Sequence, residues 1–120
     1  MNLSEVERDC LERYVRVLEE ALGDELEEVR VFGSVARGES WPAGMRIRSD
    51  LDLLVVTRTE VAPETEQELV DATYPLFLES GRQIGPTFWP RERLERPPDE
   101  RARRFLENVR RDAIPLWRRS

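Results

Sequence analysis

The spacing of apolar residues near the start of the chain predicts an amphipathic helix over residues 4–22. Apolar side chains recur there every three or four positions, so a helix would place them along one face. Ser4 followed by Glu7 forms a capping box, and Gly23 is a residue type that commonly ends helices. The apolar stripe consists of Val6, Cys10, Tyr14, Val17 and Leu18. We expect Cys10 to be a small core residue, as free cysteines usually are.

Two apolar runs predict consecutive strands of a sheet. Residues 28–32 contain β-branched and aromatic side chains and lead directly into a glycine. Residues 51–56 are almost continuously apolar, which is typical of a central strand that is covered on both faces. Asp50 and Asp52 interrupt the start of this second run. Two charged residues therefore stand at the entrance of a strand that is otherwise expected to be buried.

The next segment predicts a helix over residues 63–79. Pro63 suits the first turn of a helix, and Gly81 suits the position just after the end. Pro75 lies inside this span and lacks the amide hydrogen that a helix interior requires. We therefore expect a kink or a split within this helix.

The last third of the chain predicts one more strand and one more helix. Residues 83–89 are typical of a strand, and Pro86 within it favours an edge or bulge position. A helix is expected over residues 99–111, and Leu116 and Trp117 then suggest a short extended segment. With a further helix expected to start at Gly33-Ser34, after the first strand, the order is α-β-α-β-α-β-α, which predicts an α/β or α+β fold.

The amino-acid composition excludes several kinds of chemistry. The chain has 120 residues, which predicts a single domain over residues 1–120. It contains no His and no Lys, and Cys10 is its only cysteine. These absences exclude a His/Cys zinc site, a catalytic triad with a histidine and a lysine Schiff base. The carboxylates, arginines, hydroxyls and backbone amides that remain suit Mg²⁺ and phosphate groups.

The net charge of −6 is unevenly distributed along the chain. Residues 1–39 hold five arginines and eleven acids, whereas residues 82–120 hold eleven arginines and six acids. The arginine-rich last third either meets an anionic partner or simply exposes solvated arginines on amphipathic helices. No apolar stretch has the length of a signal peptide or a membrane span. Together with the lone cysteine, this pattern predicts a cytoplasmic protein that does not contact a membrane.

Candidate chemistry concentrates where the first strand ends and the second begins. A strand that ends in Gly33-Ser34 leaves a hydroxyl and free amides at the start of a helix, which suits a phosphate. Asp50 and Asp52 are two positions apart, so a strand would point both carboxylates to one side, where they could share a Mg²⁺ ion. Each motif alone also fits an ordinary turn or exposed acids at a strand end. Their joint occurrence predicts nucleotidyl or phosphoryl transfer.

These motifs support a resemblance to a known family. The residues concerned are Gly33, Ser34, Ala36, Arg37, Gly38 and Glu39, followed by Ser49, Asp50, Leu51, Asp52 and Leu53. The arrangement resembles the DNA polymerase β-type nucleotidyltransferase superfamily, and within it the small minimal nucleotidyltransferases. The resemblance implies a small mixed β-sheet with helices packed on it, the nucleotidyltransferase fold. It also implies Mg²⁺-dependent transfer of a nucleoside monophosphate from a nucleoside triphosphate.

The same resemblance implies a role for each motif residue. Gly33 and Ser34 would hold the triphosphate, and Arg37 would contact a phosphate through its two-pronged guanidinium group. Asp50 and Asp52 would be the catalytic carboxylates and would bind the metal. For Arg37, a solvated position on a helix surface is the alternative.

Two features of the chain depart from the family pattern. A third carboxylate usually lies on the next strand, where it helps to activate the attacking hydroxyl group. Here residues 83–89 contain no acid, Thr87 lies nearest the expected place, and Glu79 and Glu92 lie outside the strand. The loop over residues 35–49 is also longer than usual, which suits a lid, a partner surface or tolerated extra length.

Two functions from different classes follow from these observations. The first is an enzyme that transfers AMP from ATP to a protein side chain or another hydroxyl group. Minimal nucleotidyltransferases are often antitoxins of a HEPN-domain protein, so such a partner is implied. The second is a binding module that has lost turnover and binds nucleotide or its partner. Nucleic-acid binding through the arginine-rich third is a weaker third option, since the net charge is negative. A small chain also suggests a partner or a homodimer.

Overall fold

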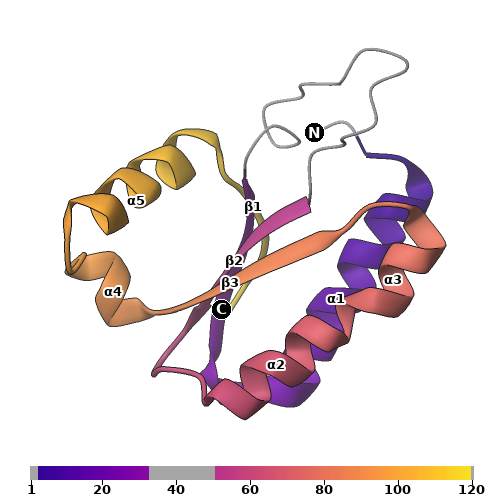
Figure 1. The fold of residues 1–120 in the computed structure, drawn as a ribbon, viewed down its shortest axis with the longest axis horizontal. Coiled ribbons are helices and arrows are strands. Elements are labelled where there is room, and N and C mark those ends of the chain that lie inside the picture. Colours follow the sequence, from indigo (N-terminus) through magenta and orange to yellow (C-terminus); the bar gives the residue numbers. More distant parts are fainter. Residues whose placement is uncertain (1–2, 33–50, 120) are drawn as a thin grey trace.

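The computed structural model describes residues 3–32 and 51–119, and its centre is a four-stranded mixed sheet (Figure 1). The strands lie in the order β3-β2-β1-β4. β2 runs parallel to β3, whereas β1 is antiparallel to both β2 and β4. The strands are β1 (Leu26–Phe32), β2 (Leu51–Thr57), β3 (Ile84–Pro90) and β4 (Ile114–Arg118). The expected small mixed sheet is therefore confirmed, and the short extended segment near Trp117 is its fourth strand.

The first helix is set by its caps. α1 (Glu5–Leu22) begins after Ser4, whose hydroxyl oxygen accepts a hydrogen bond of 3.1 Å from the amide of Glu7. In return the Glu7 carboxylate accepts one of 2.9 Å from the amide of Ser4. The helix ends at Gly23, which has a positive φ of 53° that most other residues avoid. The predicted helix and its capping box are confirmed, and a 3₁₀ turn (Gly23–Glu25) then leads into β1.

The expected interruption of the next helix is also confirmed. The segment divides into α2 (Pro63–Asp71) and α3 (Thr73–Ser80), which meet at Ala72. Pro75 lies in the first turn of α3, where a backbone amide has no intrahelical partner in any case. The break therefore comes three residues before the proline rather than at it. Gly81 ends α3 in the left-handed conformation.

The last third holds one helix that the sequence pattern did not indicate. α4 (Arg91–Glu95) follows β3 directly and has only five residues, which is too short for a clear apolar period. α5 (Glu100–Asp112) confirms the last predicted helix, and the side chain of its N-cap residue Asp99 accepts a hydrogen bond of 2.8 Å from the amide of Ala102. β3 lies at the edge of the sheet, as Pro86 predicted.

The helices form two layers, one on each face of the sheet (Figure 1). α1, α2 and α3 cover the face to which Leu53 and Val55 of β2 point, and Cys10 lies in this core with no exposed surface. α4 and α5 cover the opposite face, where Leu54 and Val56 lie. Side chains of β2 thus alternate between two apolar layers, which explains the continuous apolar run in its sequence.

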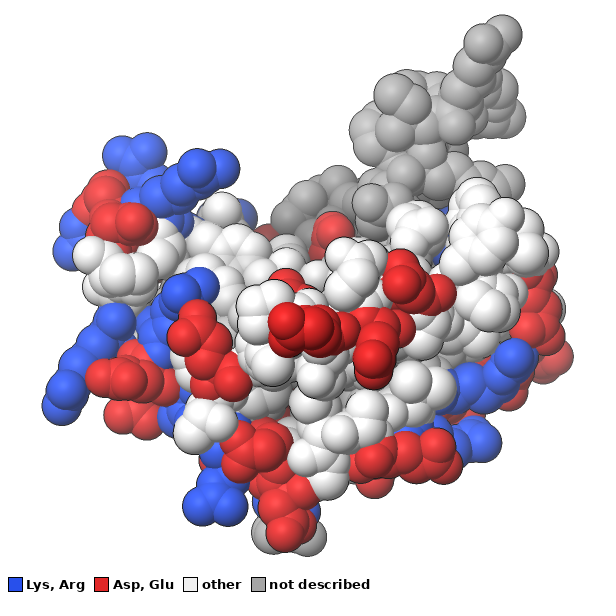
Figure 2. Space-filling view, turned by 60° about the horizontal axis from the view of Figure 1, so that its bottom comes forward, with Lys and Arg blue, Asp and Glu red and all other residues white. Residues whose placement is uncertain are grey.

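Charge is segregated in the same way as along the chain. Arginine side chains gather over α4 and α5, on the left in Figure 2, whereas acidic and uncharged side chains make up most of the face over α2 and α3. The expected helix after the first strand and the loop over residues 35–49 lie outside the described residues. Over residues 3–32 and 51–119, each helix is too short or too polar to cross a bilayer.

Candidate functional site

Asp52 is the candidate site residue whose surroundings the structure describes. It is the second residue of β2 and is half-buried. Because side chains alternate along a strand, Asp52 shares a face with Leu54 and Val56, the face covered by α4 and α5. A carboxylate thus ends an otherwise apolar row, as the sequence predicted.

The register of β1 brings the other candidate segment to Asp52. Phe32, the last residue of β1, is the antiparallel partner of Asp52 in β2. Gly33 and Ser34 follow Phe32 directly in the chain, and Asp50 precedes the start of β2. The two motifs therefore adjoin the end of β1 and the start of β2, which lie side by side at one end of the sheet. This juxtaposition depends on strand pairing rather than on nearness in the sequence.

Four of the five predicted site residues lie outside the described residues. These are Gly33, Ser34, Arg37 and Asp50. Their roles stay predictions. Trp41 and the rest of the loop between the motifs lie outside the described residues as well.

The residue of β3 beside Asp52 is Gly85. The parallel register pairs Asp52 with Gly85 and Leu54 with Thr87. Thr87, which the sequence placed nearest the expected third acid, is therefore two residues further along β3 than the partner of Asp52. A Cβ atom added at Gly85 would lie 3.6 Å from Oδ1 of Asp52, an ordinary van der Waals distance. The place on the neighbouring strand that could hold a third acid is thus occupied by a residue without a side chain.

The two other acids considered from the sequence lie far from Asp52. Glu79 is on α3, on the opposite face of the sheet, and its carboxylate binds Arg13 at 2.7 Å. Glu92 is on α4, beyond the far end of β3, about 17 Å of strand away from Gly85 at the usual rise per residue. Within residues 3–32 and 51–119, no cluster of three or more His, Cys, Asp or Glu side chains is suited to hold a metal ion.

One acid that the sequence pattern did not indicate lies at the same end of the sheet as Asp52. Asp112 is the last residue of α5, and the side chain of this acid is only 8% exposed. It precedes Ile114, the β4 partner of Val31 in β1. Asp52 is on β2, the neighbour of β1 on its other side. Only the pairing of β4 with β1 places Asp112 here, and the local sequence pattern does not reveal this pairing.

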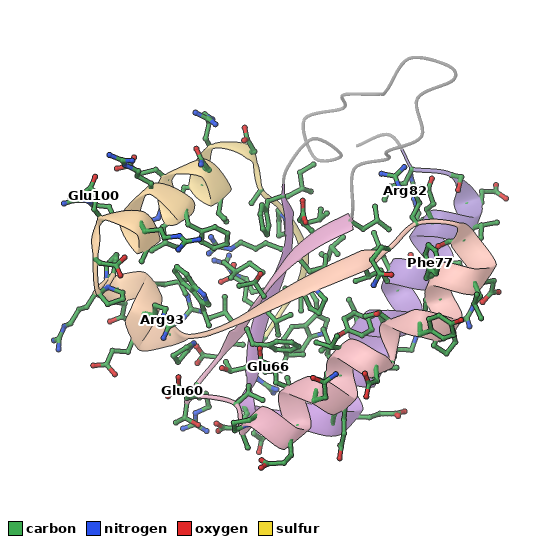
Figure 3. All side chains as sticks on the ribbon, viewed as in Figure 1. Glu60, Glu66, Phe77, Arg82, Arg93 and Glu100 are labelled. Atoms are coloured by element: carbon green, nitrogen blue, oxygen red, sulfur yellow. The ribbon has the colours of Figure 1, made fainter. Side chains whose placement is uncertain are left out.

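An aromatic wall borders the site on the α5 side. The ring of Phe105 meets Phe32 edge-on at 5.4 Å between centroids and lies 4.8 Å from the Trp89 ring. Thr87, Trp89, Phe105 and other residues line a hollow of about 360 Å³ between β3 and α5. Arg93 of α4 lies over the Trp89 ring at 5.3 Å and flanks the same hollow (Figure 3). The face of Asp52 therefore continues into an aromatic, cationic recess.

A buried ion cluster fixes the other end of β1. Glu28 is only 3% exposed, and its carboxylate binds Arg30 at 2.7 Å and Arg91 at 3.3 Å. Arg91 also binds Glu27 at 2.8 Å. Burial alone would raise the pKa of Glu28, but the two guanidinium groups outweigh it and hold the pKa below its ordinary value. The cluster links α4 to β1 and is structural rather than part of the site.

The sequence signature of the nucleotidyltransferase domain family matches residues 11–112. The chain belongs to this family. No curated protein sequence matches it closely. A solved structure assigned as a minimal nucleotidyltransferase is 30% identical, with a TM-score of 0.58 over 97% of this chain and 100% of that one. These matches confirm a nucleotidyltransferase of the minimal type.

More distantly similar solved structures share the fold. A structure of a Shewanella oneidensis HEPN toxin, carrying three AMP groups, in complex with its minimal-nucleotidyltransferase antitoxin is similar at a TM-score of 0.58. This match is 13% identical and covers 93% of our chain and 72% of that chain. An Enterococcus spectinomycin adenyltransferase bound to ATP and spectinomycin gives a TM-score of 0.67 at 16% identity, over 94% and 56% of the two chains. At these identities the likeness shows the nucleotidyltransferase fold.

Proposed function

We propose that this nucleotidyltransferase transfers AMP from ATP to a hydroxyl group of a HEPN-type partner protein, and thereby acts as its antitoxin. The observation that carries the proposal is the pairing of Asp52 with Phe32, which brings the strand ends that adjoin the two motifs side by side at one end of the sheet. Family membership supports nucleotidyl transfer. The similar antitoxin in complex with an AMP-bearing HEPN toxin supports the nucleotide and the class of acceptor.

The proposed roles of the site residues follow the chemistry of their side chains. Asp50 and Asp52 would hold Mg²⁺, since carboxylate oxygens are its preferred protein ligands. The half-buried Asp52 at the sheet edge, with no side chain at Gly85 to crowd it, fits such a group. The chemistry that Mg²⁺ supplies in this setting is neutralisation of phosphate charge. Gly33, Ser34 and Arg37 would bind and orient the triphosphate through amides, a hydroxyl and a guanidinium group.

A second function is favoured by Gly85. General-base catalysis needs a group that can accept the proton of the attacking hydroxyl, and neither glycine nor the nearby Thr87 can do so. A binding module that holds nucleotide or the partner without turnover is therefore the alternative. In the enzyme, the acceptor protein or its surrounding water would have to take the proton.

A homodimer and a cytoplasmic location are also part of the proposal.

The deciding experiment is transfer of labelled AMP. The chain is incubated with Mg²⁺ and ATP labelled in the α-phosphate, with and without the protein encoded by the neighbouring gene. We expect label on the partner, and we expect Asp52→Asn to reduce the transfer by at least a hundredfold. Glu20→Gln, an exposed change near the end of α1, is the matched control and should leave transfer unchanged.

The same samples separate the enzyme from the binding module. If no label is transferred but ATP raises the melting temperature of the wild type, the binding module is the correct function. If ATP neither labels the partner nor changes the melting temperature, both functions are wrong. Transfer that persists in Asp52→Asn would contradict the role of that carboxylate.

A further inference from the structure

The outer surface of α2 and α3 carries large apolar side chains that the core does not use. Tyr74 and Leu78 are 60% and 65% exposed, and Val70 and Phe77 are 37% and 36% exposed. We call these four residues the outer stripe. We propose that the outer stripe is the docking surface for the protein partner, which covers it with an apolar helix face flanked by basic residues. The identity of that partner as a HEPN-type protein rests on the proposed function.

The outer stripe is continuous across the junction of the two helices. Its positions, 70, 74, 77 and 78, follow the spacing of residues on one helix face. Ala72 between the helices keeps a helical conformation, with φ −65° and ψ −13°, so the face carries on through the break. The Tyr74 and Phe77 rings lie 6.5 Å apart. Figure 3 shows Phe77 on α3. The spacing and the ring pair make the four residues one apolar strip rather than scattered residues.

The inner side of α3 already supplies the residues that the core needs. Thr73 and Leu76 are buried beneath it, with 2% and 5% of their surface exposed. A surface helix normally has one apolar face and one polar face, whereas α3 is apolar on both. A contiguous exposed apolar strip is typical of a surface that another protein covers. The second apolar face of α3 is therefore not explained by folding.

The charges around the stripe define its occupant. α2 and α3 contain five acids and no basic residue. Only Glu79 is neutralised, by Arg13 at 2.7 Å. The other four form no ion pair with any residue that the structure describes; they are Glu64, Glu66, Glu68 and Asp71. A second copy of this chain would bring like charges together, which opposes association, whereas arginines or lysines flanking an apolar helix would be attracted.

The outer stripe and the candidate site lie on opposite faces of the sheet. α3 covers the face of Leu53, whereas the side chain of Asp52 lies on the face of α4 and α5. A partner held at the stripe would therefore leave the nucleotide side open. Changes at the stripe should weaken partner binding without changing the response to ATP.

The test measures, by isothermal titration calorimetry, binding of the proposed partner, the protein encoded by the neighbouring gene. We expect Leu78→Glu and Tyr74→Glu to weaken binding at least tenfold, and Asp71→Arg to weaken it and reduce its dependence on salt. Asn108→Glu is the matched control, since it also adds a negative charge to an exposed helix position, on α5. It should bind like the wild type. Circular dichroism would establish that each variant is folded.

Three outcomes would overturn the docking surface. They are wild-type affinity in folded Leu78→Glu, absence of any binding by the wild type, and a wild-type homodimer that Leu78→Glu converts to a monomer. The last result would assign the stripe to a second copy. The ATP-dependent shift in melting temperature, measured on the same variants, reports separately on the proposed function. If the wild type binds the partner but shows no shift in melting temperature with ATP, the nucleotide chemistry is rejected and the docking surface stands.

Discussion

Gly85 and Asp52 lie side by side across the parallel pair of β2 and β3, with 3.6 Å between Oδ1 of Asp52 and the position of a Cβ at residue 85. This relationship makes Gly85 the position where an acid can be added. Gly85 does not have a positive φ, so a side chain there requires no unusual backbone conformation. The space beside it accepts a Cβ at ordinary contact distance.

Gly85→Asp should increase AMP transfer at least tenfold in the labelled-ATP assay, because it supplies a general base next to Asp52. Gly85→Ala is its control: it adds the Cβ without the carboxylate, so it should fold and leave the rate unchanged. A folded Gly85→Asp protein with the wild-type rate would show that the missing acid does not limit transfer.

Glu28→Gln should lower the free energy of unfolding by about 2–3 kcal/mol, because it leaves the arginines of a buried ion cluster without their carboxylate. The pKa of Glu28 is lowered in the folded protein, so the unfolded chain binds more protons at acidic pH. The contribution of Glu28 is therefore present above the ordinary pKa of a glutamate and is lost as the pH falls. Urea unfolding at neutral pH and near pH 3 should show a large difference between variant and wild type only at neutral pH.

Tyr14→Phe should cost about 1 kcal/mol at neutral pH, since the Tyr14 hydroxyl donates a hydrogen bond of 2.7 Å to the buried Leu69 carbonyl. Burial raises the pKa of Tyr14 above that of the unfolded chain. Above about pH 10 the unfolded chain loses the tyrosine proton first, so the wild type loses stability as the pH rises. Tyr14→Phe has no hydroxyl to ionise at this position, so its free energy of unfolding should fall less than that of the wild type over the same pH range. Parallel pH dependences of wild type and variant in thermal unfolding would contradict this account.

Cys10 should be unreactive toward a thiol reagent in the native protein and reactive in 6 M urea. It has no exposed surface, and burial raises the pKa of its thiol, so little thiolate forms. The release of coloured product from a disulfide reagent measures both states. Rapid native reaction would mean that α1 separates from α3, whose Leu76 carbonyl lies 3.8 Å from the Cys10 sulfur.

Local signals predicted the elements that depend on neighbouring residues. The Ser4–Glu7 box set the start of α1, and Pro75 indicated the divided helix, because caps and prolines act within one helical turn. β1 begins at Leu26, two residues earlier than predicted, because Leu26 pairs with Thr57 of β2. The short α4 carried too few residues for a period to emerge.

Relationships across the sheet could not be predicted in the same way. The choice between Gly85 and Thr87 as the neighbour of Asp52 depends on the parallel register, which a single strand sequence does not contain. The position of Asp112 at the same end of the sheet as Asp52 depends on the pairing of β4 with β1. For the candidate site, the sequence therefore identified the residue types and their order but not their neighbours.

The pairing of Val31 with Ile114 also bears on how the protein is made. More than eighty residues separate the two partners along the chain, so this edge of β1 closes only after most of the sequence has left the ribosome. Until then the strand that leads into Gly33 exposes a row of backbone donors and acceptors that any extended segment could occupy. Completion of the sheet by β4 thus removes the unpaired edge of β1, and with it a place where the newly made chain could mispair.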